Sequence, residues 1–92
     1  MSTVEQIQLK WEEKARAKYE EMITKIPVFH REIAKKVVDK KAQLNAAERG
    51  SHQVEEEDIV KAFFTEVPKA FYSLMIRLMD EVGFDYRSCQ ES

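Results

Sequence analysis

Apolar residues recur every three or four positions through the first quarter of the chain. The positions that follow this spacing are Val4, Ile7, Trp11, Ala15, Tyr19, Met22 and Ile26. Ser2 and Glu5 stand at its start with the spacing of a helix capping box. The pattern predicts one amphipathic helix from about residue 2 to Ile26, with a charged face exposed to solvent.

The stretch KIPVFHREI interrupts this pattern at Pro27. Proline disfavours a helical conformation in the residue before it, yet it suits the first turn of a new helix. We therefore expect the first helix to end at Ile26 and a second helix to run from about Pro27 to Glu48. Phe29 is expected to anchor the two helices across this corner, and the other residues expected to hold the joint are Trp11, Ile26, Pro27 and Val37. The apolar stripe of the second helix comprises Ile33, Ala34, Val37, Val38 and Leu44, with His30 and Lys41 in the same arc.

Turn signals organise the rest of the chain. Gly50, within the polar segment 45–53, is a candidate left-handed cap, and the acidic sequence EEED begins a third helix near residue 55. Pro68 repeats the role of Pro27 and opens a fourth helix, which Gly83 ends. We predict an all-α, four-helix single domain over residues 1–84 with a long central helix, followed by a flexible polar tail over residues 85–92.

Composition agrees with a small globular domain. The 92 residues are 43% hydrophobic and 35% charged, with 2 Gly and 2 Pro, which favours helices over loops or sheet. The net charge of −2 removes the long-range attraction that drives tight binding to nucleic acid. A single cysteine, Cys89, excludes an internal disulfide and fits a reducing compartment. The sequence shows neither a signal peptide nor a membrane-spanning run, so we expect a cytoplasmic protein.

The fourth helix is apolar around most of its circumference. A helix of this kind is usually covered on two sides, and the second cover is either another protein chain or the rest of the same domain. The first alternative predicts a homodimer or partner interface, whose candidate residues are Phe64, Tyr72, Met75, Ile76 and Met79. The second places the helix at the centre of the monomer core.

Few residues carry the patterns of site chemistry. His30, His52 and Cys89 lack the spacings that bring metal ligands together, and neither a nucleophile motif nor a phosphate-binding loop is present. We therefore expect no catalysis, metal, cofactor or small-molecule substrate. An enzyme or a tetrapyrrole-binding protein would require a pocket near His30.

The middle of the chain is locally basic. The residues that could contact an anion or a nucleic acid are Arg31, Lys35, Lys36 and Lys40. On a helix these side chains spread around the cylinder instead of lining one stripe. The alternative interpretation is therefore an ordinary solvent-exposed surface with no ligand. Arg31 has a second interpretation, as the ion-pair partner of Asp39 or Glu57.

Around the Ile-Pro-x-Phe-x-Arg core, the chain resembles the C-terminal domain of the B subunit of light-independent protochlorophyllide reductase. The residues that match the pattern of that family are Trp11, Ala15, Ile26, Pro27, Phe29, Arg31, Asp39, Ala42, Val54, Glu57 and Ala62. The chain departs from it at Val28, His30, Lys41 and Glu55. The resemblance implies the fold of an accessory domain without the enzyme's activity, since one cysteine cannot hold an iron–sulfur cluster.

The order of helices also resembles the histone fold, in which a long central helix and dimerisation are the rule. The sequence thus leads to two functional hypotheses. The first is a non-catalytic accessory module that acts through a protein partner or as a homodimer. The alternative is a histone-like protein that binds nucleic acid through its basic residues.

Overall fold

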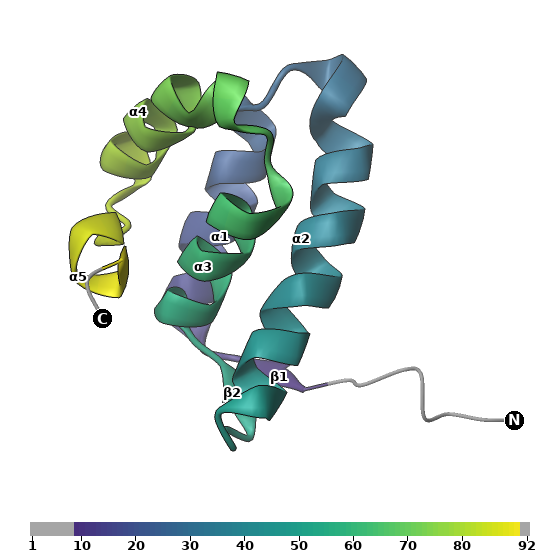
Figure 1. The fold of residues 1–92 in the computed structure, drawn as a ribbon, viewed down its shortest axis with the longest axis vertical. Coiled ribbons are helices and arrows are strands. Elements are labelled where there is room, and N and C mark those ends of the chain that lie inside the picture. The colour runs from purple at the N-terminus through teal and green to yellow at the C-terminus, as the bar shows by residue number, and fades with distance from the viewer. Residues whose placement is uncertain (1–8, 91–92) are drawn as a thin grey trace, which may run out of the picture.

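The chain folds as helices packed around one core. The computed structural model describes residues 9–90. Its elements are β1 (Lys10–Trp11), α1 (Glu13–Lys25), α2 (Val28–Glu48), β2 (Gln53–Val54), α3 (Glu56–Glu66), the 3₁₀ turn η2 (Lys69–Phe71), α4 (Tyr72–Val82) and α5 (Tyr86–Gln90). In Figure 1, α3 runs beside the long helix α2, and α4 turns away from it at the upper end of the molecule. The predicted all-α class is confirmed, with the long helix second.

The first helix starts later than its periodicity predicts. Residues 10 and 11 form β1, which pairs in parallel with β2 in the register Lys10 to Gln53 and Trp11 to Val54. The Glu12 amide then donates to the Val54 carbonyl at 2.9 Å, so a long-range pairing holds this segment extended. α1 begins only at Glu13. The predicted capping box at Ser2 and Glu5 lies outside the described residues.

Glu12 itself caps α1. Its carboxylate accepts the backbone N–H groups of Ala15 at 2.8 Å and Lys14 at 3.1 Å, which satisfies donors that have no partner within the helix. The Ala15 bond, followed by the Lys14 bond, lowers the pKa of the Glu12 carboxyl below its ordinary value. The charged form of Glu12 is therefore the one that stabilises the fold.

The joint at Pro27 forms as predicted, but a different side chain holds it. Pro27 is the N-cap of α2. Arg31 reaches back over the corner and donates from Nη2 to the carbonyls of Thr24 at 2.9 Å and Ile26 at 3.0 Å. Phe29 is 91% exposed and anchors nothing, which corrects the expectation. Trp11 also lies away from this joint, stacked on Tyr19 with ring centroids 5.3 Å apart.

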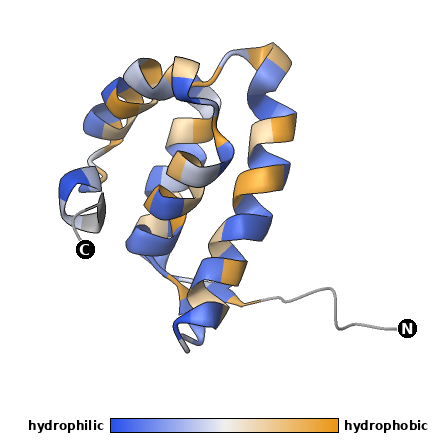
Figure 2. Ribbon diagram, in the orientation of Figure 1, coloured by the Kyte–Doolittle hydropathy of each residue, from blue (hydrophilic) through white to orange (hydrophobic). Residues whose placement is uncertain are grey.

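The core collects apolar residues from all four long helices. Its buried members are Ala15, Tyr19, Met22, Ile23, Val38, Ala42, Ala46, Val54, Ile59, Val60, Ala62, Phe63, Met75, Leu78, Met79, Val82 and Phe84. Figure 2 shows hydrophobic and hydrophilic bands alternating along the helices, as amphipathic packing requires. Ile33, assigned to the core stripe of α2, is 63% exposed and lies outside this core.

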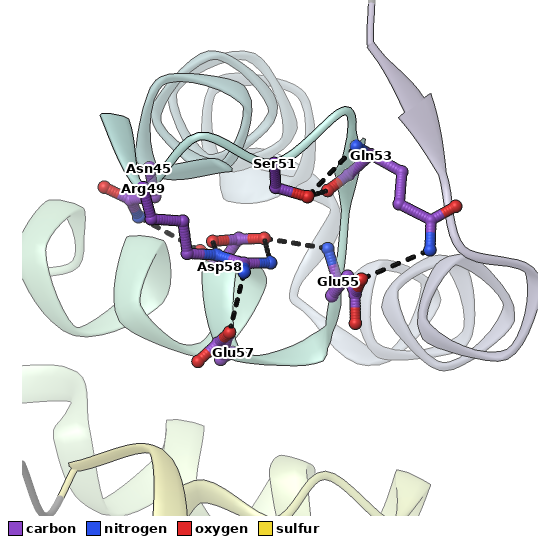
Figure 3. A network of polar contacts seen from close by, with 7 residues as sticks. All are labelled: Asn45, Arg49, Ser51, Gln53, Glu55, Glu57 and Asp58. Atoms are coloured by element: carbon purple, nitrogen blue, oxygen red, sulfur yellow. Dashed lines mark hydrogen bonds and ion pairs between the residues drawn. The ribbon is translucent and has the colours of Figure 1, made fainter. Parts of the chain in front are cut away.

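A polar network joins the end of α2 to the start of α3 (Figure 3). Asp58 is only 2% exposed, and its two carboxylate oxygens accept from Nε and Nη2 of Arg49 at 2.8 Å each. The same carboxylate accepts the backbone N–H of Glu55 at 2.8 Å and so caps α3. Asn45, also buried, donates to the Asp58 carbonyl at 3.1 Å. Gly50 adopts the predicted left-handed conformation between the helices, with φ +78°.

Regular secondary structure continues beyond residue 84, into the segment predicted to be a polar tail. Gly83 caps α4 with φ +88°, and the Phe84 amide returns to the Met79 carbonyl at 2.9 Å, as the pattern predicted. Residues 86–90 then form α5, in which half-buried Tyr86 packs against the core. The Asp85 amide donates to the Glu56 carboxylate at 2.6 Å, which fixes the start of this segment. Packed structure therefore continues past residue 84.

Within residues 9–90, no helix is both long enough and apolar enough to cross a membrane.

Candidate functional site

An apolar groove of about 460 Å³ opens between the first turns of α2 and the corner formed by α3, η2 and α4. Buried core residues, among them Met22 and Phe63, reach its base. The α2 side carries Ile33, Ala34 and Val37, and the opposite side carries Val67, Pro68, Phe71 and Leu74. The groove is thus an open continuation of the hydrophobic core.

Both proline joints that stand out in the sequence line this groove. Pro27 ends the extended link between α1 and α2, and Pro68 lies in the link between α3 and η2. Proline interrupts a helix because it lacks an N–H and clashes with the preceding turn, so the chain changes direction at each of these points. The two changes of direction leave the side chains of the next turns facing each other across the groove.

The outer edge of the groove carries exposed apolar side chains. Ile33 in the wall is 63% exposed, and Phe71 on the other side is 48% exposed. Phe29 is 91% exposed and lies four residues before Ile33, so both occupy one face of α2. Large side chains clustered in this way mark surfaces that bind other molecules more often than single exposed residues do.

The lining contains two ionisable side chains, His30 and Glu66. The centroid of the His30 ring lies 6.2 Å from that of the Phe71 ring, and the two rings are tilted by 43°, so these side chains approach each other across the groove. Among the described residues, no cluster of three or more His, Cys, Asp and Glu could hold a metal ion. Chemically, this arrangement suits the removal of apolar side chains from water.

Two of the five residues of the predicted interface on the fourth helix are used inside the monomer, and the other three are half-buried. Met75 and Met79 are buried in the core, because α4 packs on α1. Half-buried Phe64 and Tyr72 pack edge to face at 5.3 Å, and the Tyr72 hydroxyl donates to the Phe64 carbonyl. Ile76 is half-buried. One side of α4 thus packs into the monomer, and the exposed large apolar side chains Ile33 and Phe71 lie at the groove.

The predicted basic residues do not form one surface. Arg31 is bonded to the backbone carbonyls at the joint and pairs with neither Asp39 nor Glu57, which corrects that expectation. Lys35 pairs with Asp39 at 3.2 Å. Lys36 and Lys40 are exposed on α2. Two of the four candidate cations thus have partners within the chain.

A second hollow, of about 550 Å³, lies beside α1 and is lined in part by Trp11, Tyr19 and Lys35. The Tyr19 hydroxyl donates to the Asp39 carboxylate, and burial followed by this bond raises the pKa of Tyr19 well above its ordinary value. Arg16, also in the lining, pairs with Glu20 at 3.1 Å. These charges are satisfied within the chain, so the apolar groove is the stronger candidate site.

The other residues of the proposed family pattern have structural roles. Ala15, Ala42, Val54 and Ala62 are buried in the core, and Glu57 pairs with Arg49 at 3.2 Å. Arg49 and Asp58, which hold the α2–α3 connection, were not identified from sequence motifs. The available signal was the spacing of three between Glu55 and Asp58, which is that of a capping box.

Comparison with known proteins corrects the resemblance to the reductase subunit. The motif that suggested it has a local explanation, since Pro27 and Arg31 build a corner between two helices. No curated protein and no solved structure matches the chain. A family match covers residues 2–92 and is to a different family, so the assignment to the reductase domain is wrong. The chain belongs to the family described as Protein of unknown function (DUF2621).

Proposed function

We propose that this protein is a non-catalytic interaction module that binds a protein partner through the apolar groove. The observation that carries the proposal is Phe29, a large apolar side chain left 91% exposed beside an apolar groove. Fully burying such a side chain is worth about 1.5–3 kcal/mol. Aromatic side chains, Phe among them, are also enriched in protein interfaces relative to the rest of the surface.

The lining of the groove is better suited to binding a protein partner than to catalysing a reaction. Its walls are apolar, and the two ionisable side chains of the lining, His30 and Glu66, are set among them. Binding through such a surface gains its free energy from water exclusion and needs few polar contacts. The proposed location is the cytoplasm, where a protein with a single cysteine would keep its thiol reduced.

Site-specific photo-crosslinking tests the proposal. p-Benzoylphenylalanine is placed at position 29 in the whole chain, in cells that naturally carry it, and at position 47 as the control. Ala47 is exposed near the opposite end of the same helix, so it reports unspecific capture. We expect one dominant adduct from position 29 that position 47 does not give.

The captured protein is then purified and its binding measured by calorimetry. Binding should be lost in Phe29→Glu and kept in Ala47→Glu, which adds the same charge at a distance. Equal adduct patterns from both positions, or equal binding by both variants, would refute the proposal.

The groove also meets the one structural requirement of the small-ligand hypothesis, a pocket near His30. Titration with a porphyrin distinguishes a small-ligand site from a protein-binding site, because a porphyrin in contact with His30 and Phe71 would shift its Soret band. An unchanged band removes this alternative. For the nucleic-acid hypothesis, a salt-dependent gel shift on duplex DNA is the corresponding test.

A further inference from the structure

We propose that the occupant of the groove is a second copy of this chain, in a two-fold symmetric dimer in which Phe29 of each protomer enters the groove of the other. This inference rests on the proposed function of the groove and names its partner. It follows from three properties of the surface: its shape, its apolar area and its charge.

The shape is self-complementary. A projecting aromatic side chain, Phe29, and a concave apolar surface lie next to each other, because Ile33 belongs to the groove wall and stands one helical turn from Phe29. A two-fold interface uses the same patch on both protomers, so each projection must find its recess on the same face. Phe29 and the groove satisfy that condition, whereas a separate partner would need only one of them.

The apolar area is also of the right size. Phe29, Ile33 and Phe71 are 91%, 63% and 48% exposed. Since a whole aromatic side chain presents about 150–250 Å², these three together present on the order of 400 Å². A standard interface buries about 800 Å² per partner, of which about 60% is apolar. Three side chains and the open groove walls therefore supply most of the apolar area that a stable dimer needs.

Charge does not oppose self-association. The net charge is −2, so two copies repel each other weakly. The exposed charged residues on the Phe29 side of α2 are Glu32, Lys36 and Lys40, and Glu66 lies in the groove lining. Charges of both signs therefore flank the patch, so the reciprocal arrangement does not set one sign of charge against itself.

Sedimentation equilibrium of the whole chain, over about 1 to 200 μM, tests the dimer. We expect a monomer–dimer equilibrium for the unaltered chain and for the control Ala47→Glu. Phe29→Glu should raise the dimer dissociation constant by at least about 100-fold, because both aromatic anchors are lost at once. Circular dichroism at the same concentrations verifies that the variants are folded.

A mixing experiment tests the reciprocal contact. Ala34→Trp fills the groove but leaves Phe29 in place, whereas Phe29→Glu leaves the groove open. Each variant alone has lost both contacts of the dimer and should be monomeric. An equimolar mixture keeps one contact, from Phe29 of the first variant into the groove of the second, and should form a heterodimer.

The outcomes separate this inference from the proposed function. A chain that remains monomeric throughout, or a mixture that forms no heterodimer, overturns the two-fold arrangement. If that monomer still gives a single adduct with another protein from position 29, the groove binds a different partner and the proposed function stands. If position 29 gives no specific adduct either, both fail.

Discussion

Replacement of Asp58 by asparagine tests how the fold is held together at the α2–α3 connection. The substitution keeps the size of the side chain but removes its charge and one of its two acceptor oxygens. In the unaltered protein this buried carboxylate accepts two hydrogen bonds from Arg49 and one from the Glu55 amide, each at 2.8 Å. The asparagine amide could no longer satisfy all three donors.

The magnitude follows from these bonds. A hydrogen bond to a charged group is worth about 1.5–3 kcal/mol and a neutral one about 1 kcal/mol, so the weakened helix cap loses about 1 kcal/mol. The Arg49 side chain is 37% exposed, so solvent screening reduces the stabilisation lost from the Arg49–Asp58 pair to about 1–2 kcal/mol. We expect Asp58→Asn to lower the free energy of unfolding by about 2–3 kcal/mol.

Urea denaturation at neutral pH, followed by circular dichroism, measures this difference. Glu57→Gln is the matched control, because Glu57 also pairs with Arg49 but its side chain is 55% exposed. The control should change the free energy of unfolding by less than about 0.5 kcal/mol. If the two substitutions have equal effects, the buried carboxylate does not hold the connection, and the reasoning is refuted.

Three further substitutions test other parts of the structure. Phe63→Ala should cost about 3–5 kcal/mol in urea denaturation, since Phe63 is fully buried, and a loss below about 1 kcal/mol would contradict its place in the core. Phe29→Glu, compared with the unaltered chain at a concentration where both are monomeric, should leave stability within about 0.5 kcal/mol, and a large loss there would mean that Phe29 packs within the monomer. Glu12→Gln tests the lowered pKa of Glu12. A lowered pKa gives stability above the ordinary carboxyl pKa that is lost as pH falls through the folded value, so variant and unaltered chain should differ at pH 7 and converge in strong acid. A difference independent of pH would contradict this.

The local features of the fold were predictable because each depends on one residue. Pro27 cannot continue a helix, and Gly50 and Gly83 accept positive φ values at low cost, so the ends of three helices follow from residue type. The start of α1 was not predictable in this way. Trp11 continues a helical period in the sequence, but its segment pairs with β2, more than 40 residues later in the chain.

In the candidate site, too, some features could be predicted from the sequence and others depend on long-range packing. Periodicity shows that a helix has an apolar face, but it does not show which neighbour covers that face. One face of α4 packs on α1 within the monomer, whereas its composition left open whether a partner or the same domain covers it. Phe29 and Ile33 lie on α2, and only the packed structure shows that they remain exposed. The proline joints were identified from the sequence, and their meeting at one groove was not.

Chemical-shift mapping shows whether the groove is the surface through which this protein binds another protein chain. It is carried out in a dilution series of the whole chain or in a titration with the protein captured from position 29. We expect changes concentrated at groove residues such as Ile33, Ala34 and Leu74, with little change around Arg49 and Asp58. Changes centred elsewhere on the molecule, with the groove signals unmoved, would mean that another surface binds the partner.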